Sequence, residues 1–251
     1  MNRGIKIEYE LVNVFNNKKY GELNEFHQSI VKRIFPNIIE SDLISSGICN
    51  RYSKPDIYIE VSNVRKYISV KSGRSDSMHF ESIKDFIIFL RKFGISIQTQ
   101  KTILFFHYGD GTLDGTGNKR IGVEELISNY YHHIKLANYE LNNKNILLDC
   151  LDRFVFKGNE YRKVFADYIY FGNKISGVIC SKEEIIKFVL SRKYDHIRTL
   201  HIGPMTIQPY LRDIKRISKN LYKRNMIQVK WSYLLSDMQR IDSKRIWDKL
   251  W

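Results

Sequence analysis

Two short segments of this chain carry side chains that together suit metal-assisted hydrolysis. Asp56 follows Pro55 at the start of an alternating segment, and Lys71 closes the next alternating segment along the chain. If the two segments are neighbouring strands, the carboxylate and the ammonium meet at one edge of a sheet. A carboxylate is a ligand of Mg²⁺, and a lysine can orient an attacking water or stabilise negative charge that builds during hydrolysis. Asp56 and Lys71 are therefore the first candidates for a catalytic pair.

The elements expected around this pair form an α/β core. Alternation of apolar and polar residues predicts strands, and an apolar repeat of helical spacing, stopped by Pro36, predicts a helix before them. In chain order we expect a helix at 21–35, strands at 43–49, 56–61 and 66–71, a helix at 79–92 and a strand at 102–107. This core, residues 1–108, would be followed by a second lobe at 109–251.

The second lobe is predicted to be of α+β type. Ser181 with Glu184 three residues later is a capping-box pattern, which predicts the start of a helix. The other expected elements are helices at 122–140 and 144–156, a hairpin at 167–171 and 177–180, strands at 197–207 and 226–231, and a basic helical stretch at 212–224.

The motif around Asp56 and Lys71 also carries a family resemblance. Residues 20–107 resemble the PD-(D/E)xK nuclease superfamily, which includes many type II restriction endonucleases and archaeal Holliday-junction resolvases. The resemblance implies an αβββαβ restriction-endonuclease-like core. It also implies that Asp56 ligates Mg²⁺, or Mn²⁺ in its place, and that Lys71 orients the attacking water.

A further acidic ligand is implied in the first helix of such a core. The resolvase-like pattern places this acid four residues after a glycine, which points to Glu25 after Gly21, with Glu22 as the alternative. Either residue would bind a second ion or position the water. As a helix-face glutamate, each is equally compatible with simple exposure to solvent.

Ser69 departs from the family pattern, because it stands where the motif has Asp or Glu. Some restriction-enzyme branches with S-x-K take the carboxylate from the following helix instead. Glu81, ten residues after Lys71, is the corresponding candidate, and Asp76 and Glu60 are weaker ones. The alternative for Glu81 is that it stabilises the N-terminus of that helix through the helix dipole.

The charge of the chain indicates a polyanionic partner. The net charge is +14, and residues 196–251 hold 12 Lys and Arg against 4 Asp, a net +8. Such a concentration favours nucleic acid, whereas a membrane surface would call for a basic amphipathic helix near a terminus. The expected DNA contacts are Ser72, Arg74, His79, Thr206, Gln208, Arg212, Lys215, Arg216, Lys219, Lys223 and Arg224.

These observations predict a sequence-specific endonuclease of the type II restriction kind, acting on double-stranded DNA. The resemblance implies hydrolysis to 5′-phosphate and 3′-hydroxyl ends. Cutting both strands requires two sites, so we expect a homodimer, with a DNA methyltransferase as its cognate partner. Three alternatives stay open: a Holliday-junction or other structure-specific nuclease, a catalytically inactive DNA-binding protein, and an RNA-binding protein, which aromatic residues on an exposed sheet would favour.

Composition excludes several other classes. No apolar run approaches the roughly 20 residues that span a bilayer, and residues 1–6 lack the apolar core of a signal peptide. Cys49, Cys150 and Cys180 form no CxxC pair, so no disulfide framework or zinc site is predicted. We therefore expect a cytoplasmic protein.

Overall fold

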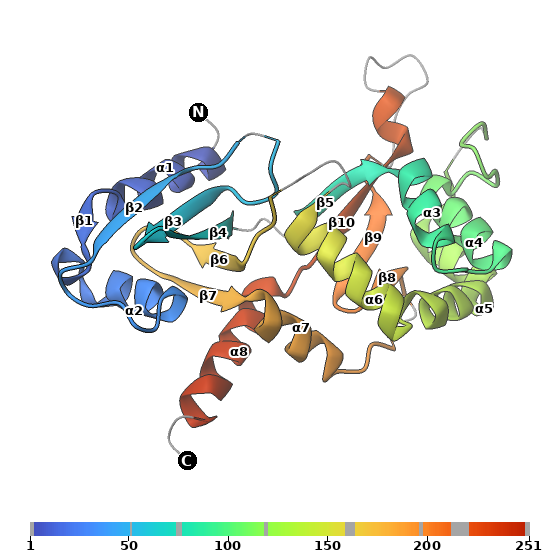
Figure 1. The fold of residues 1–251 in the computed structure, drawn as a ribbon. Coiled ribbons are helices and arrows are strands. Elements are labelled where there is room, and N and C mark those ends of the chain that lie inside the picture. Colours follow the sequence, from blue (N-terminus) through green and yellow to red (C-terminus); the bar gives the residue numbers. More distant parts are fainter. Residues whose placement is uncertain are drawn as a thin grey trace. The chain divides into compact units, whose positions relative to one another are not determined.

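The computed structural model describes residues 3–50, 52–73, 77–117, 120–158, 164–195, 198–211 and 221–248. The chain is mixed α/β, as predicted, and divides into two compact units (Figure 1). Unit 1 comprises residues 1–75, 155–188 and 233–251, and unit 2 comprises residues 76–154 and 189–232. The division therefore differs from the boundary expected after residue 108, because both units are built from segments distant in sequence.

Unit 1 is built around one six-stranded sheet with the order β1-β2-β3-β4-β6-β7. Strands β4 and β6 are parallel, and all other neighbours are antiparallel. The elements are α1 (Arg3–Phe15), β1 (Lys18–Lys19), the 3₁₀ turn η1 (Tyr20–Glu22), α2 (Glu25–Ile34), β2 (Leu43–Ile48), β3 (Ile57–Val61), β4 (Val64–Lys71), β6 (Tyr168–Gly172), β7 (Gly177–Ser181), α7 (Lys182–Leu190) and α8 (Leu234–Asp248).

The core of unit 1 lies between the sheet and helix α1. This helix packs on β2, β3 and β4, and Leu11 and Phe15 from it are almost fully buried against Ile44, Ile59 and other strand residues. Elsewhere in the unit, Arg33 of α2 forms ion pairs with Glu184 of α7 and Asp242 of α8. The helices are thus fixed to the sheet by apolar burial and to one another by a shared arginine.

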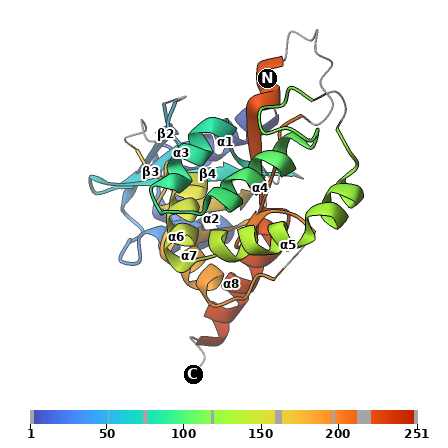
Figure 2. The same ribbon diagram turned by 90° about the vertical axis from the view of Figure 1, so that its right-hand side faces the viewer.

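Unit 2 contains an antiparallel sheet with the order β5-β10-β9-β8. Helices α3, α4 and α5 pack on β5, β9 and β8 respectively, and Figure 2 shows α4 between α3 and α5. The elements are β5 (Ser77–Ser82), α3 (Ile83–Arg91), α4 (Ile97–Tyr108), α5 (Val123–Leu141), α6 (Lys144–Leu151), a π-helical turn (Asp152–Lys157) that runs on into unit 1, β8 (His201–Ile202), β9 (Met205–Pro209), the 3₁₀ turn η3 (Leu221–Asn225) and β10 (Met226–Lys230).

Most of the predicted elements of unit 1 are confirmed. The three expected strands at 43–49, 56–61 and 66–71 are β2, β3 and β4, and the hairpin at 167–180 is β6 and β7. The predicted capping box is present, because Glu184 Oε2 accepts from the backbone N–H of Ser181, and Ser181 Oγ accepts from that of Glu184. Alternation and capping were therefore reliable guides to this part of the chain.

Between residues 77 and 108, the helix predicted at 79–92 is present but begins later than expected, and the strand predicted at 102–107 is wrong. Residues 77–82 form a strand paired with β10, and the helix begins only after Ser82, whose hydroxyl accepts from the Asp85 backbone N–H. Residues 97–108 are helix α4 instead of a strand, started by the N-cap Ser96 and ended by Gly109 in the left-handed conformation. The expected αβββαβ run is therefore not completed within residues 20–107.

Candidate active site

Asp56 is held at the entrance to β3 by four hydrogen bonds. Its backbone N–H donates to the Ile68 carbonyl, and its own carbonyl accepts from the Cys49 N–H, both at 2.9 Å. Its carboxylate Oδ2 accepts from the Val70 backbone N–H at 2.6 Å and from Ser69 Oγ at 3.1 Å. Because β3 and β4 are adjacent, the carboxylate is fixed beside the end of β4.

Ser69 therefore has a definite function in the position where the family pattern has an acid. The side chain is buried, with 1% of the residue exposed, and its hydroxyl donates to the carboxylate of Asp56. A carboxylate at this position would instead lie against that of Asp56 and repel it. Ser69 therefore orients Asp56, and its neutral side chain offers a metal ion no negatively charged ligand.

Lys71 is the last residue of β4 and is half-buried. It lies two residues after Ser69, so both side chains share one face of the strand. Asp56 bonds to Ser69 and Val70, the two residues that precede this lysine. The predicted juxtaposition of Asp56 and Lys71 at one end of neighbouring strands is thus present.

The structure adds a third charged residue, Glu8 of α1. Burial raises the pKa of Glu8, the negative charge of Asp56 raises it further, and the positive charge of Lys71 lowers it. The charges of Asp56 and Lys71 therefore both act on the carboxylate of Glu8. Helix α1 supplies this residue because it packs across β2, β3 and β4.

Glu8 was missed because the helix that carries it was not predicted. A signal was available, since Ile7, Leu11 and Phe15 repeat every four residues and all three are buried. Glu8 lies next to this apolar stripe, at its edge. A half-buried acid in that position faces the sheet and its neighbouring side chains.

Glu25 and Glu22 occupy other positions. Glu25 is exposed in the first turn of α2, where a negative charge stabilises the helix N-terminus. Glu22 accepts a hydrogen bond from the Lys19 backbone N–H in the turn before that helix. In the part of the chain that the structure describes, Glu8 is the helical acid whose charge interacts with Asp56 and Lys71.

Glu81 lies in unit 2, on β5, and the prediction that it begins a helix is wrong. It is buried, with 2% exposed, and both carboxylate oxygens accept from Nε of Arg153 at 3.1 Å. Nε2 of His79 lies 3.6 Å from the same carboxylate. Burial favours the neutral acid, but the interactions with His79 and Arg153 outweigh it and hold the pKa of Glu81 below its usual value. This carboxylate is engaged in a buried ion pair inside its own unit.

The acidic groups available for a cation are therefore few. Within the described residues, no group of three or more His, Cys, Asp and Glu side chains is placed to hold a metal ion. Glu60 is paired with Arg65 at 2.6 Å, and Asp76 lies outside the described residues. Asp56 and Glu8 remain as two carboxylates on one site.

Cys49 adjoins the same site through its hydrogen bond to Asp56. Burial, followed by the charge of Asp56, raises the pKa of Cys49 to about 11. Burial also raises the pKa of Cys180 to about 12 and that of Cys150 above its usual value. All three thiols stay protonated at neutral pH, so a thiolate nucleophile is not available from any of them.

The residues predicted to contact DNA fall into three groups. Arg74, Arg212, Lys215, Arg216 and Lys219 lie outside the described residues. His79 is 6% exposed and packs on Phe154, so its expected surface contact is not available. Ser72, Thr206, Gln208, Lys223 and Arg224 are half-buried and keep part of their surface accessible.

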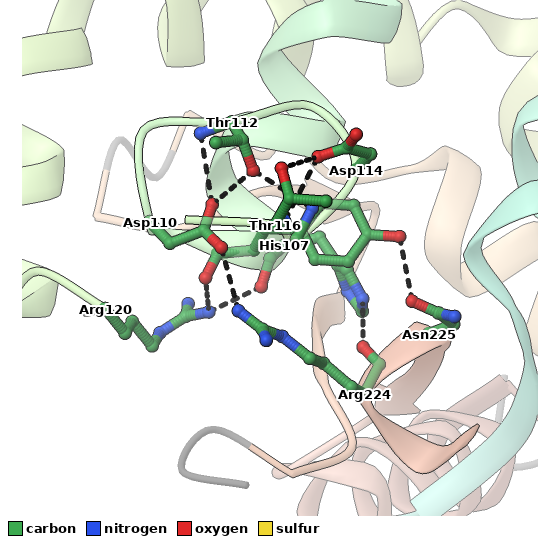
Figure 3. A network of polar contacts seen from close by, with 10 residues as sticks. His107, Asp110, Thr112, Asp114, Thr116, Arg120, Arg224 and Asn225 are labelled. Atoms are coloured by element: carbon green, nitrogen blue, oxygen red, sulfur yellow. Dashed lines mark hydrogen bonds and ion pairs between the residues drawn. The ribbon is translucent and has the colours of Figure 1, made fainter. Parts of the chain in front are cut away.

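Arg224 is committed to a network within unit 2 (Figure 3). Its guanidinium pairs with the Asp110 carboxylate at 2.8 Å, and its carbonyl oxygen lies 2.8 Å from Nε2 of His107. Arg120 donates to the carbonyls of His107 and Tyr108 at the end of α4. These contacts fasten the loop after α4 to η3, which gives Arg224 an anchoring role in addition to its charge.

A cavity of about 1040 Å³ lies in unit 2, apart from the residues named above. Its lining includes Asn138 of α5, Asn142, which follows the last residue of that helix, and His201 of β8. The two amides are used structurally, because Asn138 bonds to Thr199 and His201, and Asn142 to His201 and Gly203. These side chains bind β8 to α5, and we assign the cavity no reaction.

Comparison of the chain with protein-family models and with curated proteins finds no match. Across the described ranges, no helix combines the length and the apolar character needed to cross a membrane.

Proposed function

We propose that this chain is a Mg²⁺-dependent DNA endonuclease whose hydrolytic site consists of Asp56, Lys71 and Glu8. One observation carries the proposal. Hydrogen bonds to Ser69 and Val70 fix the carboxylate of Asp56 beside the end of β4, where Lys71 lies, and the charges of Asp56 and Lys71 both act on Glu8. An acid and a lysine at one end of adjacent strands, with a second acid from α1, suit phosphodiester hydrolysis, since they can hold a cation and stabilise developing negative charge.

The strand order of unit 1 supports this proposal. After the helices α1 and α2 come three antiparallel strands, β2, β3 and β4, and then β6 parallel to β4. The αβββαβ pattern of the PD-(D/E)xK superfamily has a helical crossing before its last strand. In this chain the connection from β4 to β6 is instead the long segment 72–167, most of which belongs to unit 2.

The two carboxylates fit a magnesium ion. Mg²⁺ is commonly held by one or two carboxylates together with waters and substrate phosphates, so a third acidic side chain is not required. Asp56 and Glu8 would be the protein ligands, and bound Mg²⁺ would act as a Lewis acid and make water a stronger nucleophile. Burial, and then the negative charge of Asp56, raise the pKa of Glu8, and a bound cation would relieve the repulsion between the two carboxylates.

The chain's own side chains would then perform the remaining tasks. Ser69 would keep Asp56 facing the site through its hydroxyl. Lys71 would hold the attacking water and stabilise negative charge on the phosphoryl oxygens. In-line hydrolysis would leave 5′-phosphate and 3′-hydroxyl ends, and the net charge of +14 would draw the polyanionic substrate. Type II specificity, a homodimer and a cognate DNA methyltransferase belong to the same proposal.

A second candidate function is DNA binding without catalysis. It is favoured by one observation: in the described part of the chain the site offers two carboxylates and no cluster of three metal-binding side chains. The net charge of +14 would then serve binding alone.

Cleavage of supercoiled plasmid and of linear duplex DNA with Mg²⁺ separates the two. We expect discrete products from the native protein and a loss of at least about 100-fold with Asp56→Asn, Lys71→Met or Glu8→Gln. Glu25→Gln is the matched control, since this acid is exposed on α2, and it should cleave normally. Binding without cleavage in any divalent metal would support the second function, and cleavage confined to four-way junctions would point to a resolvase.

A further inference from the structure

The sheet of unit 2 has two different faces. Strand residues Ile207, Ile227 and Val229 are buried, as are His79 and Glu81, and the cross-strand register places these side chains on one face. The residues between them, Phe80, Gln208 and Gln228, point to the opposite face and keep surface exposed. Because Gln228 pairs with both Phe80 and Gln208, these three form one row across β5, β10 and β9.

Two aromatic rings lie together on this second face. Phe80 and Tyr210 meet edge to face with ring centroids 4.9 Å apart. Phe80 of β5 is 43% exposed, and Tyr210, which directly follows β9, is 36% exposed, so both large rings keep surface accessible. An edge-to-face pair leaves a ring surface uncovered for a further planar group.

A positive charge adjoins the rings. Nζ of Lys223 lies 5.8 Å from the centroid of Tyr210 and 5.7 Å from that of Tyr222, which is 65% exposed. Lys230 follows Gln228 on the same face of β10. The described strand residues of this face include no acid, because Glu81 points the other way.

The strip of Phe80, Tyr210, Lys223 and Tyr222 therefore alternates ring surfaces with a cation. Exposed aromatic rings beside lysines can bind nucleic acid, because bases stack on the rings and lysines neutralise the phosphates of the backbone. In a duplex the base faces are already stacked on one another, whereas an unpaired strand presents them freely. Glutamine amides such as Gln228 and Gln208 can also donate to and accept from base edges.

We propose that this face of unit 2 binds a single strand of nucleic acid by stacking unpaired bases on Phe80 and the neighbouring tyrosines. Lys223 neutralises a phosphate between the stacked bases. The site uses unit 2 residues alone and does not depend on the hydrolytic site proposed above. It adds recognition of unpaired nucleotides to a chain whose sequence predicted contacts to duplex DNA.

Fluorescence anisotropy with the full chain tests this proposal, using labelled 20-mers of oligo(dT) and oligo(U) and a blunt duplex. EDTA and a Lys71→Met background keep any cleavage from affecting the result. We expect either single strand to bind more tightly than the duplex, and the two single strands distinguish DNA from RNA. Phe80→Leu and Tyr210→Leu keep an apolar side chain but remove the ring, and each should weaken single-strand binding about 5-fold or more.

Matched controls lie on α5 of the same unit. Tyr139, 82% exposed, and the exposed Lys135 carry the same chemistry outside the strip. Tyr139→Leu and Lys135→Gln should bind as the parent does, whereas Lys223→Gln should reduce the dependence of binding on salt. The proposal is overturned if the ring variants bind as tightly as the controls, or if the duplex binds more tightly than both single strands. Unchanged circular dichroism of Phe80→Leu establishes that any loss is not unfolding.

Discussion

The buried pair of Glu81 and Arg153 yields a prediction that separates a structural role from a metal-binding one. Arg153 is 7% exposed and Glu81 2%, and the guanidinium binds both carboxylate oxygens. Arg153 also lies over the ring of Phe89, at 4.5 Å from the centroid. Glu81→Gln removes the negative charge with little change in volume and leaves the guanidinium buried without its counter-charge.

The expected cost follows from this burial. Removing one partner of a buried ion pair typically costs about 3–5 kcal/mol, because the remaining charge is still out of water. Replacing both partners by apolar groups, as in Glu81→Leu with Arg153→Met, removes both desolvated charges together. We therefore expect the double variant to be less destabilised than the sum of the two single variants by about 2 kcal/mol or more.

Urea unfolding measures these differences. The transition would be followed by circular dichroism and by tryptophan fluorescence, to which Trp231, buried in unit 2, contributes. Glu125→Gln on α5, an exposed acid of the same unit, is the control and should change the free energy of unfolding by less than about 0.5 kcal/mol.

The contrary result is equally specific. If Glu81→Gln unfolds at the same urea concentration as the parent but loses Mg²⁺-dependent cleavage, Glu81 acts at the metal and the structural reasoning is refuted.

Three further predictions concern other parts of the molecule. Burial lowers the pKa of His107 from 6.5 to about 4, so the unfolded chain binds a proton first as the pH falls. The free energy of unfolding, measured with urea, should therefore fall by up to about 3 kcal/mol between pH 6.5 and 4, and less steeply in His107→Gln. Ser69→Ala, which frees the Asp56 carboxylate of one bond, should slow cleavage about 10-fold while the urea midpoint moves little. Gly115→Ala places a Cβ 2.6 Å from the Tyr108 ring at a φ of +77°, so we expect a loss of more than about 1 kcal/mol, measured by thermal melting.

Local patterns in the sequence were sufficient for much of unit 1. Alternation identified β3 and β4, and with them the position of Asp56 and Lys71, because a two-residue period has few other physical explanations. The stretch at 102–107 was misjudged for the opposite reason. A short apolar run is compatible with a buried strand or a buried helix, and only the N-cap Ser96 and the terminal Gly109 mark it as part of a helix.

The identity of the remaining acid could not be derived from local patterns. Glu8 reaches Asp56 because α1 packs on the sheet, which is a long-range property of the fold. Glu81 is buried in an ion pair with Arg153, which lies 72 positions away in the chain. The spacing of residues around a motif indicates candidates, but tertiary packing decides which of them meet.

The interleaving of the two units has a consequence for how the chain folds. Ile68 of β4 pairs with Tyr168 of β6, and Ser82 of β5 pairs with Met226 of β10, so each sheet joins strands made far apart in time on the ribosome. Closing loops of this length slows folding and delays the completion of both sheets. A fragment that stops at residue 108 would leave the edges of β4 and β5 unpaired, and we expect it to aggregate. During synthesis the edge of β4 therefore stays unpaired until β6 has emerged, and the edge of β5 stays unpaired until β10 has emerged.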